Sequence, residues 1–152
     1  MLKEYLSSCQ LLIFRGFIPA GEERNTDTRK ETAIPQLPEG LSSLEIHLDP
    51  ENQSDQIHKA FADAFATGKR KVGGLLSLPS GLEAKQLEEA FLSLRVLDAC
   101  IGPDSSGGMY FLGLNSFDPS MLPADWNESR LCKVHTRRLG DLKKVLYRLP
   151  SL

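Results

Sequence analysis

The sequence predicts an α/β fold: a single domain with a mixed sheet of about five strands, a parallel βαβαβ centre and three flanking helices. Two observations support this. Between residues 41 and 115, apolar runs and amphipathic stripes alternate in the order strand, helix, strand, helix, strand. With 152 residues, the chain suits one domain, residues 1–152, with a substantial core. If the two middle connections made antiparallel or split pairings, the class would instead be α+β.

The first strand and helix of this centre follow from two different periods. Leu44, Ile46 and Leu48 alternate with polar residues, which is typical of a half-buried strand. A helix follows, with Asp49 or Ser54 as its expected cap. Its apolar stripe consists of Ile57, Ala60, Phe61, Ala64 and Phe65.

The second strand and helix are separated by a turn. Residues 72–78 are apolar apart from Ser77, which indicates a strand covered on both faces. Ser80 and Glu83 have the spacing of a capping box and predict the start of a helix. That helix is expected to end at Gly102 and Pro103. Its stripe contains Leu87, Ala90, Phe91, Leu94 and Leu97.

Residues 109–114 form the most apolar run and predict a central strand. Strands joined through a helix are most simply parallel, with right-handed crossovers. Under that rule the Ser/Gly-rich loop at 102–108 follows a helix. It would then lie at the opposite edge from the carboxyl ends of the strands, as a simple connecting loop.

The flanking segments predict less regular structure. Residues 9–17 are apolar enough for a strand, and a long polar loop is expected at about 19–40. Trp126 is expected to pin a later loop to the core. Alternation over 131–136 predicts an edge strand, and a leucine stripe predicts a final helix over 139–149.

Parallel strands would bring several polar residues to one edge of the sheet, where open α/β sheets bind ligands. The expected ligand-binding residues are Asp49, Ser80, Gly81, Asn115 and Asp118. The alternative is that these residues cap helices and form turns.

Known catalytic and metal-binding motifs are absent from the sequence. The three histidines form no HxxxH or HExxH pattern, and the three cysteines form no CxxC pair. No GxSxG, GxGxxG or GxxxxGK[ST] motif occurs. The sequence therefore predicts no metal site and no cofactor, and it favours the absence of catalysis without deciding the point.

Charge is divided unevenly along the chain. The net charge is −2, yet residues 130–152 carry seven Lys or Arg against one acid. This basic segment predicts either a surface for an acidic partner or attraction between the two halves of the molecule. The expected partner-binding residues are Lys133, Arg137, Lys143 and Lys144.

Composition also bears on location and partners. No run approaches a membrane span, and no secretory signal is recognisable. Unpaired cysteines favour a cytoplasmic, intracellular protein. The acidic balance does not favour nucleic acid, and the sequence is compatible with a homodimer.

The sequence alone favours a non-catalytic protein-interaction module, such as an adaptor, regulator or inhibitor-like partner of another protein. The alternative is a small ligand-binding domain or enzyme that uses a site at the carboxyl edge of the sheet.

Overall fold

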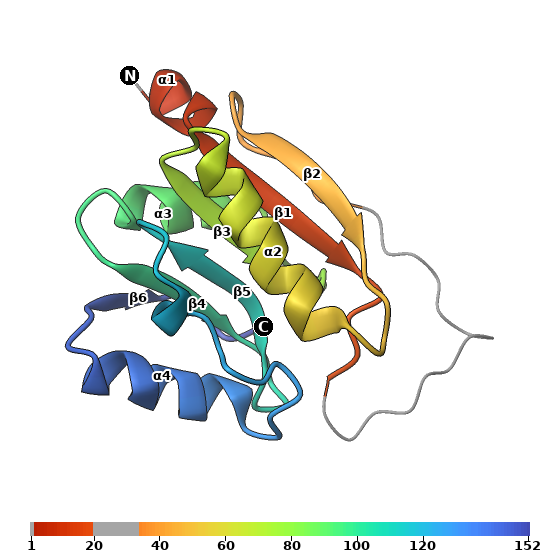
Figure 1. Cartoon of the computed structure of the whole chain (residues 1–152). Helices are drawn as coiled ribbons and strands as arrows, with labels where there is room; N and C mark the ends of the chain where they lie inside the picture. The colour runs from red at the N-terminus through yellow and green to blue at the C-terminus, as the bar shows by residue number, and fades with distance from the viewer. Residues whose placement is uncertain (1, 20–33) are drawn as a thin grey trace.

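Six strands form one sheet in the computed structural model, which describes residues 2–19 and 34–152 (Figure 1). The strands are β1 (Cys9–Arg15), β2 (Ser42–His47), β3 (Lys71–Leu75), β4 (Ala99–Pro103), β5 (Met109–Leu114) and β6 (Leu146–Arg148). The α-helices are α1 (Leu2–Ser7), α2 (Gln53–Ala66), α3 (Ala84–Ser93) and α4 (Leu131–Asp141), and a 3-10 turn, η1, spans Pro119–Met121. Most of the long polar loop expected at 19–40 lies outside the described residues.

The sheet is mixed, with the strand order β2-β1-β3-β5-β4-β6. β1 pairs in parallel with β2 and β3, and β4 pairs in parallel with β6. β5 is antiparallel to both of its neighbours, β3 and β4. The predicted α/β class with a parallel core is confirmed, with six strands and four helices in place of about five and three.

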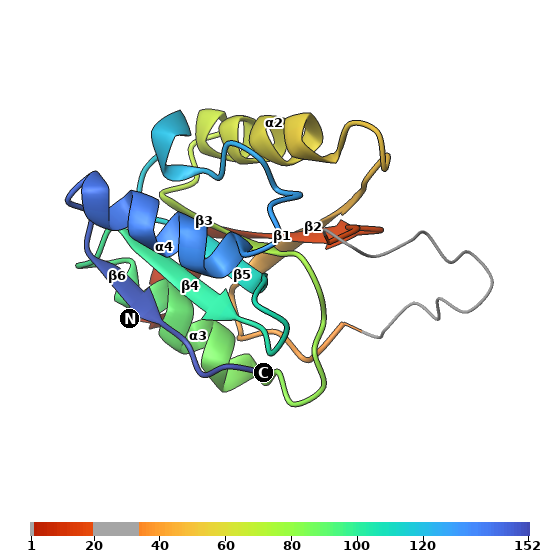
Figure 2. The same ribbon diagram turned by 90° about the horizontal axis from the view of Figure 1, so that it is seen from below.

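Helices cover both faces of the sheet (Figure 2). Along β1, Leu12 and Phe14 pack in a cluster with side chains from α2 and α4. Leu11 and Ile13 point the other way and pack in a cluster with side chains from α1 and α3. This alternation follows from the period of two in a strand, and it gives the molecule three layers.

Two glycines in β3 let aromatic rings approach the centre of the sheet. A Cβ at Gly73 would lie 2.5 Å from the Phe111 ring, and one at Gly74 would lie 2.8 Å from the Phe14 ring. Phe91 of α3 packs edge to face on Phe111, with 6.0 Å between ring centroids. The prediction that this strand is buried on both faces is confirmed.

The predicted end of the second helix is wrong. α3 ends at Ser93, and the chain then forms β4 instead of continuing to Gly102. Leu94 and Leu97 have the spacing of a helical stripe, which predicts a longer helix. Val96 between them is 82% exposed and does not widen this stripe as expected. Pairing with β5 and β6 buries β4 completely, and such long-range pairing leaves no local signal.

The third strand of the predicted βαβαβ unit has the opposite direction. β4 and β5 form an antiparallel pair joined by a short loop, so β5 returns across the sheet instead of crossing over through a helix. It inserts between β3 and β4, which remain parallel to each other because both are antiparallel to β5.

The predicted C-terminal elements are exchanged. The expected edge strand at 131–136 is the start of α4, and β6 lies inside the expected helix at 139–149. Leu131, His135 and Leu139 recur every four residues and are all buried, whereas Val134 is exposed. The helical period therefore overrides the short alternation of polar and apolar residues.

The expected helix caps are displaced by a few residues. Asn52 precedes α2 at its N-cap, while the Oδ1 of Asp49 accepts a hydrogen bond from the backbone N–H of Glu51 in the preceding turn. Glu83 is the N-cap of α3, and its backbone N–H donates to the side chain of Gln86 at 2.9 Å. The reciprocal box expected between Ser80 and Glu83 is therefore one turn too early.

Candidate ligand pocket at the carboxyl edge of the sheet

The carboxyl ends of β1, β2, β3 and β4 lie at one edge of the sheet, because these four strands run in the same direction. β5 runs the other way, so its carboxyl end and Asn115 lie at the opposite edge. The backbone oxygen of Asn115 accepts a hydrogen bond from the Nζ of Lys71, at the beginning of β3. In open α/β sheets, ligands bind at the carboxyl edge.

A pocket of about 400 Å³ opens at this edge. Segments that follow three strands supply its wall: Phe17 and Pro19 after β1, Leu76 and Ser77 after β3, and the loop 104–108 after β4. Its other lining residues are Met109, Trp126, Glu128, Ser129 and Leu131. The volume falls within the range of pockets that bind small molecules.

Asp104 holds the loop between β4 and β5 in shape. Its Oδ1 accepts hydrogen bonds from the backbone N–H and the hydroxyl of Ser106, at 2.9 and 2.7 Å, and from the backbone N–H of Gly108 at 2.9 Å. Gly107 has a φ of 96°, which disfavours a residue with a side chain. The loop also accepts a bond from α4, since Cys132 N–H donates to the Gly107 carbonyl at 3.1 Å.

Gln53, at the start of α2, ties two segments of the rim together. Its side-chain amide both accepts from and donates to the backbone of Ile18, at 3.0 and 2.8 Å, and it also donates to the Oδ1 of Asn127. Only 2% of Gln53 is exposed. Because a buried amide retains its partners strongly, the segments after β1 and before α4 are fixed relative to each other.

Trp126 is buried against the pocket, as expected from the sequence. Its ring meets the edge of His58, with 6.5 Å between centroids, and its indole N–H has no hydrogen-bond partner within the described residues. Among the apolar lining residues, Phe17 is half-buried, whereas Trp126 and Met109 are only 1% and 2% exposed. Ser77, Ser105 and the other serines give it a hydroxyl-rich side.

This arrangement suits a small ligand that has a flat or apolar part and several hydroxyl groups. Asp104 and Glu128 are the carboxylates among the pocket's lining residues. Within residues 2–19 and 34–152, no group of three or more His, Cys, Asp or Glu residues could hold a metal ion.

The structure separates the residues predicted to bind a ligand. Asp49, Ser80 and Gly81 follow β2 and β3 at the carboxyl edge, but none of them lines the pocket. Asn115 and Asp118 lie beyond the end of β5 at the opposite edge, so the expected grouping of all five residues is wrong. Whether any of them contacts a ligand stays a prediction.

Asp118 instead begins η1. Its Oδ1 accepts hydrogen bonds from the backbone N–H and the hydroxyl of Ser120, at 3.0 and 2.7 Å. These bonds hold the pKa of this exposed carboxyl below its ordinary value. The capping interpretation that the sequence left open therefore describes Asp118.

The loop 104–108 was the main residue set that sequence reasoning missed. The sequence predicts this loop at the opposite edge, because the residues before it have the apolar spacing of a helix. The Ser and Gly content of the loop was a visible signal. Its location could be assigned only once residues 99–103 were known to form a strand parallel to β3.

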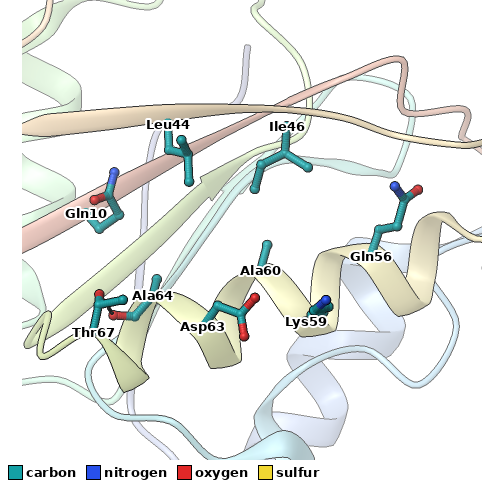
Figure 3. Close-up of a pocket in the computed structure, with 9 residues that line it drawn as sticks. All are labelled: Gln10, Leu44, Ile46, Gln56, Lys59, Ala60, Asp63, Ala64 and Thr67. Atoms are coloured by element: carbon teal, nitrogen blue, oxygen red, sulfur yellow. Dashed lines mark hydrogen bonds between the residues drawn. The ribbon is translucent and has the colours of Figure 1, made fainter.

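A second cavity, the sheet-edge groove, lies away from the carboxyl edge (Figure 3). It has a volume of about 540 Å³ and separates Leu44 and Ile46 of β2 from Lys59, Asp63 and other residues of α2. Leu44 is 54% exposed, and β2 lies at the edge of the sheet. The groove has a mixed lining, and none of the polar loops at the carboxyl edge reaches it.

Comparisons with known proteins agree with an α/β fold. The family model described as "Uncharacterized protein conserved in bacteria (DUF2064)" matches residues 25–128, so the chain belongs to this family. No curated protein sequence matches the chain.

None of the helices in the described part of the chain is long and apolar enough to cross a membrane.

A similar solved structure is that of a protein from Desulfovibrio desulfuricans G20, which is described as a proposed nucleotide-diphospho-sugar transferase. The two chains share 17% sequence identity with a TM-score of 0.66, and the match covers 95% of this chain and 80% of the other. At this identity the likeness establishes the fold.

The interpretation as a non-catalytic interaction module is wrong. The fold resembles that of a proposed nucleotide-diphospho-sugar transferase, and the family match gives no support to an adaptor or regulator role. The alternative drawn from the sequence, a ligand-binding domain or enzyme with a site at the carboxyl edge, agrees better with these findings.

Proposed function

We propose that this protein binds a nucleotide-diphospho-sugar in the pocket at the carboxyl edge. The observation that carries the proposal is the position of the pocket, which lies where open α/β sheets bind ligands, in a fold similar to that of a proposed nucleotide-diphospho-sugar transferase. The same position makes transfer of the sugar to an acceptor the proposed activity.

The lining of the pocket fits the parts of such a ligand. Phe17, which is half-buried, offers an apolar ring of the kind on which a nucleobase or the face of a sugar packs, whereas Trp126 and Met109 are buried. The exposed hydroxyls of Ser77 and Ser105 can donate to phosphate oxygens or accept from sugar hydroxyls.

Binding of nucleotide-diphospho-sugars by isothermal titration calorimetry tests the proposal. The panel should vary the base and the sugar separately, and the protein should be the full chain. Ser77→Trp places a large ring in the pocket from an exposed position. We expect at least one member of the panel to bind the unaltered protein, and Ser77→Trp to weaken its binding by at least tenfold.

Ser116→Trp is the matched control, because Ser116 is an exposed serine just beyond β5 at the opposite edge. Its affinity should stay within twofold of the unaltered protein. The proposal fails if no member of the panel binds, or if Ser77→Trp binds as well as Ser116→Trp. Release or transfer of the sugar from the ligand that binds would then be assayed with the same two variants.

We also propose that the protein acts in the cytoplasm. Cys9, Cys100 and Cys132 are free and buried, as expected of thiols that serve as small apolar core residues in a reducing compartment. Labelling of all three thiols after unfolding without reductant would support this, whereas a recovered disulfide would contradict it.

A further inference from the structure

Beside the ligand pocket, the carboxyl edge has another cavity, the basic groove, which lies between α4 and β6. It has a volume of about 650 Å³. Its lining residues are Pro103, Asp104, Ser106, Gly107, Ser129, Arg130, Cys132, Lys133, Thr136, Arg137, Arg148 and Ser151. Serine and threonine hydroxyls lie among four cationic side chains, so the groove presents both charge and hydrogen-bond donors.

The positive charge of the groove is not neutralised locally. Arg130, Lys133, Arg137 and Arg148 are exposed, and none forms an ion pair within the described residues. Asp104 is the only carboxylate side chain among the lining residues, and its Oδ1 already accepts three hydrogen bonds within its own loop. An anion that enters the groove would therefore meet four cations with little local competition.

The cations stand on well-fixed elements. Lys133 and Arg137 share one face of α4, and Arg130 precedes them at helical spacing as the N-cap of this helix. The opposite side of α4 is held by buried Leu131, His135 and Leu139. Arg148 stands on β6, which pairs with β4.

The basic groove and the ligand pocket share a wall. Asp104, Ser106 and Ser129 line both cavities, so the loop between β4 and β5 separates them. A ligand in one cavity would therefore be separated from a ligand in the other only by these shared lining residues. Neighbouring cavities of this kind allow two ligands to be bound close to each other, which a reaction between two substrates requires.

We propose that the basic groove binds the phosphate group of a second, phosphorylated small-molecule ligand. Arginine side chains form paired hydrogen bonds to phosphate oxygens, and three of the four cations are arginines. The concave shape and the nearby serines favour a compact anion over an extended polyanion. The inference goes beyond the proposed function, because it assigns a second ligand to a different cavity. The groove can therefore be tested while the pocket is blocked.

Of the four basic residues predicted from the sequence to bind a partner, the groove contains two. Lys133 and Arg137 line it, whereas Lys143 and Lys144 follow the end of α4 and do not. The phosphate proposal therefore uses Arg130 and Arg148, which the sequence-based set omitted.

Titration with inorganic pyrophosphate, followed by amide chemical shifts of the full chain, provides the test. We expect shifts at Ser106, Ser129 and the first turn of α4, and an affinity that falls as NaCl rises. The double variant Lys133→Glu and Arg137→Glu should lose at least tenfold in affinity. Lys59→Glu with Lys85→Glu, on exposed positions of α2 and α3, changes the net charge equally and should stay within twofold.

A third arm uses Ser77→Trp, which blocks the pocket and leaves the groove open. Retained pyrophosphate binding in this variant supports a separate phosphate site, even if no nucleotide-diphospho-sugar binds. Loss of pyrophosphate binding in Ser77→Trp would mean that phosphate enters through the pocket, and it overturns the proposal. Equal weakening by the two charge-reversed variants would also overturn it, because it would show a response to net charge alone.

Discussion

The centre of the sheet and its carboxyl edge are built from opposite kinds of residue. Around β3, glycines bring Phe14, Phe91 and Phe111 into contact with the backbone, and every residue from Val72 to Leu75 is buried. At the carboxyl edge, Asp104 and its serine neighbours form a half-exposed loop held by its own hydrogen bonds.

This difference separates stability from binding. Apolar burial at the centre supplies most of the favourable free energy of folding, since it scales with the apolar area removed from water. The edge contributes little apolar burial, but it presents hydroxyls and cations on fixed loops. Substitutions at the centre should therefore change stability, and substitutions at the edge should change binding first.

The largest expected effect is at Phe111. Truncation to Ala removes a fully buried ring and its edge-to-face contact with Phe91. The free energy of unfolding should fall by about 3–5 kcal/mol. Denaturant unfolding measures this loss, with Phe117→Ala as the control because Phe117 is 39% exposed. Similar losses at both positions would break the comparison.

Buried His135 should make the stability of the fold depend on pH. Burial, helped by the nearby positive charge of Arg138, lowers the pKa of His135 to about 4, although its hydrogen bond to the Met121 carbonyl acts in the opposite direction. The unfolded state, with an ordinary pKa near 6.5, takes up a proton first as the pH falls. Stability should be complete above about 6.5 and decline towards 4, with a loss of roughly 2 kcal/mol between pH 7.5 and 5.

Chemical denaturation at a series of pH values measures this dependence. His135→Gln can donate to the same carbonyl but does not titrate, so its stability should vary less between pH 7.5 and 5. A variant that loses stability on acidification as steeply as the unaltered protein would assign the effect to other groups.

A smaller effect is expected at Asp104. Its replacement by Ala removes the acceptor of three hydrogen bonds in a half-exposed loop, which should cost about 1 kcal/mol. Asn keeps one carbonyl oxygen at this position and should cost less. Thermal unfolding of the two variants distinguishes them. Equal losses would show that the hydrogen bonds at Oδ1 do not hold the loop.

The sequence predicts elements whose signal is local. The stripe from Ile57 to Phe65 and the apolar run at 109–114 lie in a helix and a strand as expected. The strand at 99–103 escaped notice because its stability comes from pairing with β5 and β6, and because Leu94 and Leu97 imitate a longer helix.

The candidate site depended on this one assignment. The direction of β5 decides whether the loop 104–108 or Asn115 lies at the carboxyl edge, and direction is set by long-range pairing. The polar residues themselves were visible in the sequence. Their grouping around a pocket could not be predicted, because three loops from distant parts of the chain form it.

Mapping of the binding site by amide chemical shifts tests the central claim most directly. The unaltered protein would be titrated with the nucleotide-diphospho-sugar that binds best in calorimetry. We expect the largest shifts at Ser77, Ser105 and Gly108 around the pocket, with little change at Lys59 and Asp63 in the sheet-edge groove. Largest shifts in the sheet-edge groove, with the loop 104–108 unaffected, would contradict the assignment of the carboxyl edge as the ligand site.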